Sequence, residues 1–267
     1  MTVTIHPSSI VDPAAKLGDG TVIGPFCVVG PNVELGEGVE LLSHVVVEGR
    51  TRIGPRTRIF PFASIGHPPQ DLKFRGEASE LVIGSDNTIR EHVTMNPGTA
   101  GGGMVTVVGD RCLFLVGSHI AHDCRVGNNV ILSNNASLAG HVVVGDHAII
   151  GGLSGVHQFV RIGEHAMIGG MTAVDQDVIP YGLVVGDRGY LAGLNLVGLK
   201  RRGFGREEIN GLRAAFRELF QEGGHLATRV EALIARKDDN PAVDRLIEFL
   251  SADSDRKILQ PKQSDGT

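Results

Sequence analysis

Histidines and one aspartate in the middle of the chain are the residues best suited to acid–base chemistry. They are His119, His122, Asp123, His141 and His157. An imidazole can accept or release a proton near neutral pH, and an adjacent carboxylate can orient it as a general base. The pair His122-Asp123 therefore predicts base catalysis at this position.

Two other interpretations of these histidines stay open on the residues alone. Imidazoles that gather on a repetitive scaffold can be surface residues without a role, although their coincidence on one edge makes that the weaker interpretation. The imidazoles can also bind Zn²⁺, as in proteins with a six-residue repeat that resemble the γ-carbonic anhydrases.

A six-residue repeat of aliphatic residues must position these side chains. The repeat runs from Ile5 to Ile65, resumes at Ile83, Ile89 and Met95, and continues from Val108 to Val174. The fifth place of each hexad is small or β-branched, and all three cysteines, Cys27, Cys112 and Cys124, fall there. A period of six fits neither a helix nor a single amphipathic strand, so it predicts a solenoid.

The predicted fold is a mainly β protein, a left-handed parallel β-helix with three hexads in each triangular coil and a C-terminal α-helical domain. Aliphatic residues point into the shaft, and coils stack at the usual strand spacing of roughly 4.8 Å. Hexads that open at Ile120, Leu138 and Val156 lie eighteen residues apart and therefore stack on one face. One edge of the shaft should thus carry the histidines.

Breaks in the period divide the chain. We expect the β-helix over residues 1–187, with loop insertions near 67–82 and 97–107, and the helical domain over 188–267. The apolar spacing predicts helices from Arg206, from Leu226 and from the N-cap pair Asn240-Pro241, followed by a polar, frayed tail after Ser251. Loops held on a rigid shaft favour ligand contacts, so the polar cluster of Gln70, Asp71 and Lys73 is a candidate binding site.

Composition restricts the class of protein. With 42% hydrophobic residues, 37 glycines and 4% aromatics, the chain suits a narrow aliphatic shaft. The net charge of −5 argues against a general nucleic-acid binder. No stretch approaches the roughly 20 apolar residues that span a bilayer, and no leader precedes the repeat, so we expect a cytoplasmic protein. The three cysteines, an odd number at places that need a small apolar side chain, are expected to be buried and unpaired.

Local strings resemble one family closely. HIAHDC (119–124), NNASLAGHV (134–142), GVHQF (155–159), QDLK (70–73) and GLKRRGF (198–204) are similar to the UDP-N-acetylglucosamine O-acyltransferases that open lipid A synthesis. The resemblance implies transfer of a 3-hydroxyacyl chain from acyl carrier protein to the 3-position of UDP-N-acetylglucosamine. It also implies a homotrimer with active sites between the shafts, and a reaction without metal or cofactor.

The resemblance implies a role for each matching residue. His122 would be the general base, Asp123 would orient it, and the backbone N–H of Gly140 would stabilise the oxyanion. Substrate binding would fall to Gln70, Asp71, Lys73, Asn96, His119, His141, His157, Gln158, Asn195, Arg201 and Arg202. The basic residues Arg201 and Arg202 would meet phosphate or the acidic carrier, and the acyl groove would include Met167, Gly170 and Arg188.

Four positions depart from the family pattern. Asn96 and Arg188 stand where histidines are familiar, Pro97 replaces a basic residue, and Val197 replaces an acidic one. We hypothesise that the acceptor could be the 3-amino analogue of the sugar, which would give an amide. Gly170 stands where a bulky residue shortens the acyl groove in some relatives, so the resemblance implies a chain of about twelve to fourteen carbons. The rival functions are a metal-dependent hydratase of the γ-carbonic anhydrase kind and a catalytically silent scaffold.

Overall fold

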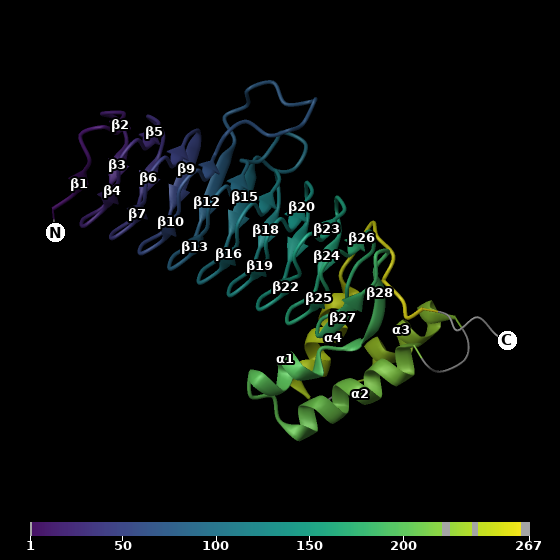
Figure 1. The fold of residues 1–267 in the computed structure, drawn as a ribbon. Coiled ribbons are helices and arrows are strands. Elements are labelled where there is room, and N and C mark those ends of the chain that lie inside the picture. The colour runs from purple at the N-terminus through teal and green to yellow at the C-terminus, as the bar shows by residue number, and fades with distance from the viewer. Residues whose placement is uncertain (1, 221–224, 237–239, 263–267) are drawn as a thin grey trace.

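A long stack of short strands forms most of the molecule, and helices cover its C-terminal end (Figure 1). The structure, a computed structural model, describes residues 2–220, 225–236 and 240–262. Over these residues the strands form three sheets, and the chain visits each sheet once per coil. The predicted parallel β-helix is confirmed.

The three sheets are called A, B and C. Sheet A contains, in spatial order, β1 (Thr4–Ile5), β4 (Val22–Ile23), β7 (Glu40–Leu41), β10 (Arg58–Ile59), β13 (Thr88–Ile89), β16 (Leu113–Phe114), β19 (Ile131–Leu132), β22 (Ile149–Ile150), β25 (Met167–Ile168), β27 (Gly182–Val185) and β28 (Tyr190–Leu194). Sheet B contains β2 (Ile10–Val11), β5 (Val28–Val29), β8 (Val46–Val47), β11 (Ser64–Ile65), β14 (Thr94–Met95), β17 (His119–Ile120), β20 (Ser137–Leu138), β23 (Gly155–Val156) and β26 (Ala173–Val174). Sheet C contains β3 (Lys16–Leu17), β6 (Glu34–Leu35), β9 (Arg50–Ile53), β12 (Glu80–Ile83), β15 (Val105–Val108), β18 (Arg125–Val126), β21 (Val143–Val144) and β24 (Arg161–Ile162).

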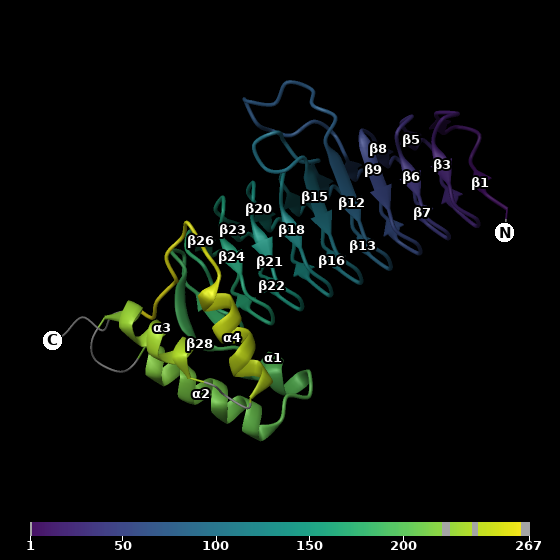
Figure 2. The same cartoon turned by 180° about the vertical axis from the view of Figure 1, so that it is seen from behind.

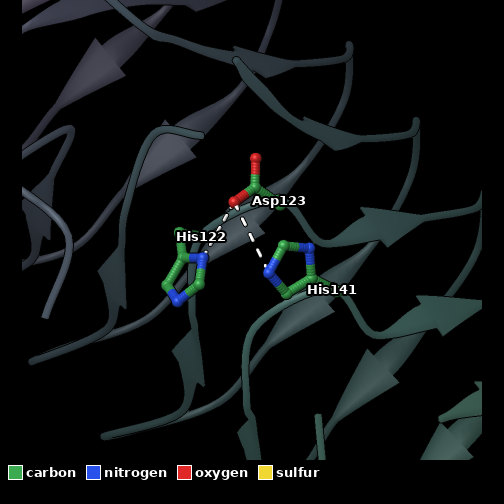
Figure 3. A group of neighbouring side chains, drawn as sticks. All are labelled: His122, Asp123 and His141. Carbon is green, nitrogen blue, oxygen red and sulfur yellow. Dashed lines mark hydrogen bonds and ion pairs between the residues drawn. The ribbon is translucent and has the colours of Figure 1, made fainter. Parts of the chain in front are cut away.

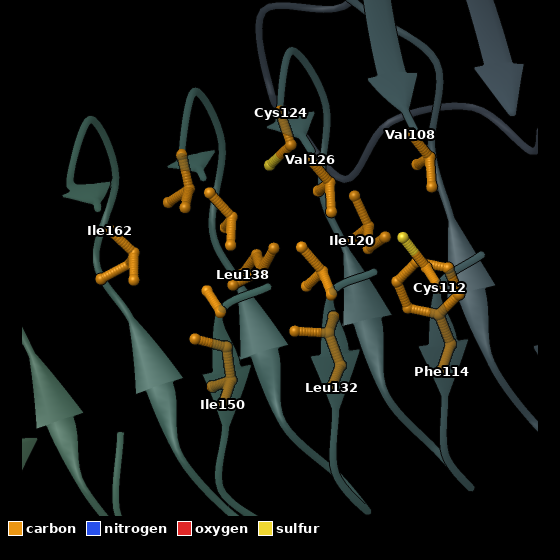
Figure 4. Packing of buried hydrophobic residues seen from close by; sticks show 14 of the residues in the cluster. Val108, Cys112, Phe114, Ile120, Cys124, Val126, Leu132, Leu138, Ile150 and Ile162 are labelled. Carbon is orange, nitrogen blue, oxygen red and sulfur yellow. The ribbon is translucent and has the colours of Figure 1, made fainter. Parts of the chain in front are cut away.

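Aliphatic residues fill the shaft in columns (Figure 4). Ile120, Leu138 and Val156 are register partners in sheet B, and each is buried. The cysteines at the fifth hexad place are also buried and free, as predicted. Burial raises the pKa of the Cys112 thiol to about 11 and that of Cys124 to about 12, so both stay protonated and apolar at neutral pH.

Corners of the coils need a left-handed backbone. At the corner between sheets B and C, Asp123, His141 and Phe159 have φ values of 60°, 64° and 65°. Their φ values lie in the region that most side chains avoid, and aspartate and histidine are among the residues that tolerate it best. Two of the candidate site residues therefore lie on the corner because the coil must turn there.

The two insertions lie on one side of the shaft, where the first projects well clear of it (Figure 2). They connect β11 to β12 and β14 to β15, so they are shorter than the sequence predicts. The reason is that the four-residue strands β12 and β15 start early and pair along their full length.

Helices follow an antiparallel hairpin of β27 and β28. They are α1 (Leu196–Arg201), α2 (Arg206–Phe220), α3 (Leu226–Ala235) and α4 (Pro241–Ser251), and α2 contacts both α3 and α4. The three helices expected from the sequence are present, and the Asn240 side chain caps α4 by accepting from Ala242 N. Helix α1 was not expected. The expected division at 187/188 falls within the hairpin.

The segment after α4 is ordered and wraps back onto the shaft. We call residues 252–262 the C-terminal strap. Asp177 N donates to Lys257 O, Leu259 N donates to Asp177 O, and Leu259 is buried. The tail predicted after Ser251 is polar, but the expectation that it is frayed is wrong for residues 252–262, because backbone pairing and one buried leucine hold this segment. Its last part, residues 263–267, lies outside the described residues. Across the described ranges, no helix is long and apolar enough to cross a bilayer.

Candidate functional site

A groove of about 750 Å³ runs along the outer face of sheet B. Its floor is made by the outward residues of successive coils, Ser137, Gly155 and Ala173, which are register partners. Their small side chains leave an open, largely apolar channel. Its walls include His119, His122, Gly140, His157, Gln158, Gln70 and Arg188.

His122 and Asp123 form a buried pair (Figure 3), and His122 lines the groove. His122 Nδ1 lies 2.8 Å from Asp123 Oδ2, and the two residues are 7% and 5% exposed. The His141 ring meets the His122 ring edge-on at 5.1 Å and stacks on Phe159 at 4.4 Å. Successive coils thus bring His122 and His141 together, as the eighteen-residue spacing of their hexads predicts.

The second insertion holds the Asp123 carboxylate. Thr99 N donates to Oδ1 at 2.9 Å, and Thr99 Oγ1 donates to Oδ2 at 2.6 Å. Asp123 N donates to Thr106 Oγ1 at 2.8 Å. A Cβ at Gly102 would overlap the Asp123 carboxyl group, so only glycine lets the loop pass this closely. The loop therefore encloses a carboxylate that has hydrogen-bond partners on both oxygens.

These contacts assign the protons of His122. Both Asp123 oxygens accept hydrogen bonds from Thr99, which is the pattern of an ionised carboxylate. Nδ1 of His122 is then the donor to Asp123, and the lone pair of the neutral ring lies on Nε2. Nε2 has no hydrogen-bond partner among the described residues, so it is free to accept a proton.

Gly140 lies one coil beyond His122 in the same hexad place. A Cβ at Gly140 would lie 2.5 Å from Cε1 of His122, so the ring packs directly on this backbone. Within the described part of the chain, the Gly140 N–H donates to no protein atom, although its carbonyl accepts from Phe159 N. A free N–H beside the free Nε2 is the arrangement that an oxyanion site needs.

Burial favours the neutral form of two neighbouring histidines, His119 and His141. Burial lowers the pKa of His119, while its hydrogen bond to Thr94 opposes that effect. Burial also lowers the pKa of His141, against the opposing charge of Asp123. The groove therefore offers imidazoles that can hydrogen-bond without placing further positive charge beside His122.

His122, Asp123 and His141 also have the composition of a three-ligand metal site, since one ligand atom from each lies within 4.8 Å of the others. The Asp123 oxygen that faces both imidazoles already accepts from the Thr99 hydroxyl. A metal there would have to share that oxygen with Thr99. The donor set is therefore possible for a metal, but its hydrogen bonds suit a proton relay better.

The first insertion brings its polar cluster to this site. Gln70 lines the groove, and the charges of Asp71 and Lys73 act in opposite directions on the pKa of His141. Asp71 Oδ1 accepts from Lys73 N at 3.0 Å, which shapes the loop. Asn96 anchors the same insertion, because its Nδ2 donates to His67 O at 3.0 Å while its buried Oδ1 has no partner among the described residues.

Other predicted residues lie on a different face of the same subunit. Met167, Asn195, Arg201 and Arg202 line a second cavity of about 630 Å³ over sheet A, which we call the sheet A pocket. Asn195 caps α1 by accepting from Gly198 N and also donates to His165 O. Gly170 lines neither cavity and lies beside Gly152 at a corner. Within one chain, these residues do not meet His122.

Several site residues were missed from the sequence. Thr99 and Gly102 come from the second insertion, where the glycine-rich string was the available signal, and Thr106 lies in β15 directly after it. Arg256 of the C-terminal strap reaches the groove and contacts His157 and Gln158. No periodic pattern could have placed Arg256, because it follows the last helix.

Two family models match three segments of the chain. Residues 177–259 match the model described as UDP-N-acetylglucosamine O-acyltransferase, domain 2. Residues 14–49 and 106–140 match the bacterial transferase hexapeptide repeat.

Curated relatives and solved structures agree over most of the chain. The acyl-[acyl-carrier-protein]–UDP-N-acetylglucosamine O-acyltransferase of Sinorhizobium fredii is 51% identical over 261 residues, 97% of this chain and 96% of the relative. That of Paracoccus denitrificans is 60% identical over 202 residues, 76% of each chain. The structure of LpxA from Acinetobacter baumannii has a TM-score of 0.92 at 41% identity, covering 96% of this chain and 99% of its own. LpxA from Moraxella catarrhalis gives 0.92 at 40% identity, with 96% and 99% covered.

Proposed function

This chain belongs to the family of acyl-[acyl-carrier-protein]–UDP-N-acetylglucosamine O-acyltransferases, and we propose that it catalyses their transfer in the sheet B groove with His122 as general base. The reaction is the first step of lipid A synthesis, with a 3-hydroxyacyl chain as the transferred group. The observation that carries the residue assignment is the Nε2 of His122, which has no partner among the described residues, while Nδ1 of the same ring lies 2.8 Å from Asp123 Oδ2.

In the proposed mechanism, Nε2 takes the proton of the sugar 3-hydroxyl as its oxygen attacks the thioester carbonyl of the acyl carrier protein. Asp123 stabilises the imidazolium that forms, and Thr99 donates to both oxygens of the Asp123 carboxylate. The Gly140 N–H donates to the developing oxyanion. When the C–S bond breaks, His122 returns its proton to the leaving thiolate, so no acyl-enzyme and no metal are required.

We assign the substrate contacts by the face on which they lie. Gln70, Asp71, Lys73, His119, His141, His157 and Gln158 lie at or near the groove and would bind the sugar nucleotide or the acyl donor. Asn195, Arg201 and Arg202 lie at the sheet A pocket, with Met167. A homotrimer, in which the groove of one shaft faces the sheet A pocket of the next, would unite the two sets. Homotrimer formation and the cytoplasmic location stay predictions.

The acyl chain would lie along the small residues of the groove floor, toward Arg188. A chain of about twelve to fourteen carbons remains the prediction from the family resemblance, although Gly170 itself lines neither cavity. The Asn96 side chain donates to the backbone of the first insertion, at His67 O. An assay with both sugars therefore tests whether the acceptor is the 3-hydroxyl or the 3-amino group. Preferred use of a ten-carbon donor would contradict the predicted length.

The test is acyl transfer from 3-hydroxyacyl carrier proteins of several lengths to UDP-N-acetylglucosamine and its 3-amino analogue. We expect His122→Ala to lower kcat by about 10²–10⁴-fold, the usual contribution of a general base, without unfolding the protein. His92→Ala is the matched control, because His92 is an exposed corner histidine stacked on Phe62 and lies outside the groove. Substantial activity in His122→Ala would exclude His122 as the base.

The metal hypothesis rests on the cluster of His122, Asp123 and His141, and the same assay tests it. Turnover that resists a chelator, in enzyme without stoichiometric zinc, supports proton transfer. Loss of turnover with the chelator and recovery with Zn²⁺ would favour a metal-dependent enzyme. Failure to bind any UDP-sugar would favour a silent scaffold.

A further inference from the structure

Arg256 is a strap residue whose guanidinium reaches two residues at the edge of the groove. Its Nη2 lies 2.8 Å from His157 Nδ1, and its Nε donates to Gln158 O at 3.1 Å. Arg256 is half-buried, whereas Lys257 beside it is exposed. The planar guanidinium therefore binds both residues at once, as a compact ammonium could not.

A buried ion pair fixes the strap that carries Arg256. Asp177 is fully buried, and its Oδ2 accepts from Arg161 Nε and from Ser254 Oγ, each at 2.7 Å. Ser254 Oγ in turn accepts from Arg256 N at 3.1 Å. A continuous chain of hydrogen bonds thus runs from the shaft through the strap to the groove, so the position of Arg256 is set by the fold.

The contact determines which nitrogen of His157 carries the proton. A guanidinium only donates hydrogen bonds, so Nδ1 at 2.8 Å must accept. The alternative tautomer would direct an Nδ1 proton at the guanidinium, with only a 3.3 Å contact to Gln158 O in exchange. Neutral His157 therefore carries its proton on Nε2.

We propose that Arg256 is a positioning residue that holds His157 as an Nε2–H donor for an acceptor oxygen of the bound substrate. The proposal deepens the assignment of His157 to substrate binding and rests on the acyl transfer proposed above. Arg256 acts through His157, so its effect on turnover should vanish when the imidazole is removed.

The direct test is ¹⁵N NMR of enzyme labelled at histidine, with the His157 signals assigned by their loss in His157→Gln. We expect the Nε2–H tautomer in the unsubstituted enzyme and a mixture, or the Nδ1–H form, in Arg256→Ala. Lys257→Ala is the matched control, since it removes an exposed positive charge from the adjacent strap position, and it should keep the Nε2–H tautomer. An Nδ1–H tautomer in the unsubstituted enzyme would overturn the proposal even if acyl transfer is normal.

Kinetics provide the second test. Arg256→Ala should lower kcat/KM by about tenfold, the effect of one lost hydrogen bond, and Lys257→Ala should leave it unchanged. Arg256→Lys should recover only part of the loss, because one ammonium cannot replace the two-pronged contact. In a double-mutant cycle, Arg256→Ala should add nothing to His157→Gln.

The outcomes separate this proposal from the proposed function. Additive effects of the two substitutions, or full activity of Arg256→Ala, would overturn the role of Arg256 while leaving acyl transfer intact. Absence of acyl transfer in the unsubstituted enzyme, with the Nε2–H tautomer present, would instead contradict the function. Circular dichroism of each variant shows whether the fold is retained.

Discussion

At the scale of single residues, the site depends on one carboxylate with several partners. Asp123 interacts with His122, with both donors of Thr99 and, at 4.0 Å, with His141. In this buried setting each hydrogen bond restricts the carboxylate, and the carboxylate restricts His122. In the proposed mechanism, the orientation of His122 therefore depends on both Asp123 and Thr99, although Thr99 touches no substrate.

Thr99→Val tests that role. The change keeps the shape but removes the hydroxyl that donates to Asp123 Oδ2, so kcat should fall by about tenfold while KM changes little. Thr99→Ser should restore most of the rate. Thr51→Val is the control, since the buried Thr51 hydroxyl donates to Glu48 O away from the groove. Equal rates for Thr99→Val and the unsubstituted enzyme would remove Thr99 from the relay.

At the scale of elements, the second insertion packs tightly on the Asp123 carboxylate, through the hydrogen bonds of Thr99 and the close approach of Gly102. Gly101→Ala should be nearly neutral, within about 0.5 kcal/mol, because its Cβ would lie 3.9 Å from Thr99 Oγ1. Gly102→Ala should lower both kcat and stability, because its Cβ would overlap the Asp123 carboxyl group. Urea unfolding and acyl transfer assays of the two neighbouring variants check this. Equal effects of Gly101→Ala and Gly102→Ala on kcat and stability would contradict this tight packing on Asp123.

A second element-scale feature is the ring stack that joins α1 and its following turn to the shaft. His165 stacks on His147 at 4.6 Å and on Tyr181 at 5.7 Å, and it meets Phe204 edge-on. Burial, together with the charges of His147 and Arg202, lowers the pKa of His165 to about 4, while Asp146 opposes them. Its Nδ1 is buried without a partner in the described chain.

This stack predicts a loss of stability in acid. Between about pH 6.5, the ordinary histidine value, and about pH 4, the unfolded chain takes up a proton at His165 that the folded chain does not. Stability therefore falls as the pH falls through that window. His165→Phe removes this contribution, so its melting temperature should exceed that of the unsubstituted protein more at pH 5 than at pH 7. His44→Phe is the control, because His44 lies in an exposed ring stack. Melting temperatures of His165→Phe and the unsubstituted protein that change equally with pH would contradict this role of His165.

The six-residue period predicted the strands far better than the loops. Ile120, Leu138 and Val156 pair in register because every column residue must face the shaft, so histidines could be placed in space from spacing alone. Thr99 and Arg256 could not be placed, since the paths of an insertion and of a terminal segment follow from tertiary hydrogen bonds. Helix α1 was missed because a six-residue helix with one buried residue has no clear period.

At the scale of the whole molecule, one chain carries two separated halves of the predicted site. The groove over sheet B holds His122, and the sheet A pocket holds Arg201. If each site is completed by a neighbour in a trimer, subunits with different defects can complement each other. The arrangement of the sites is therefore testable with mixed assemblies.

Co-expression of differently tagged His122→Ala and Arg201→Ala chains gives such mixtures. Purified mixed trimers should regain part of the activity that each pure variant lacks, because some sites pair an intact His122 with an intact Arg201 from the neighbour. Light scattering after size exclusion checks the trimer. If the two residues act within one chain, the mixed assembly stays as inactive as its parents.

The cysteines buried in the shaft have a practical consequence for labelling. Cys27, Cys112 and Cys124 are all buried, and burial raises the pKa of each thiol, so they should be poor nucleophiles toward maleimides. A single cysteine introduced at Leu72, which is 96% exposed in the first insertion, would then be the preferred site of reaction. A fluorophore attached there would report on substrate arrival in a chain that keeps all its native thiols.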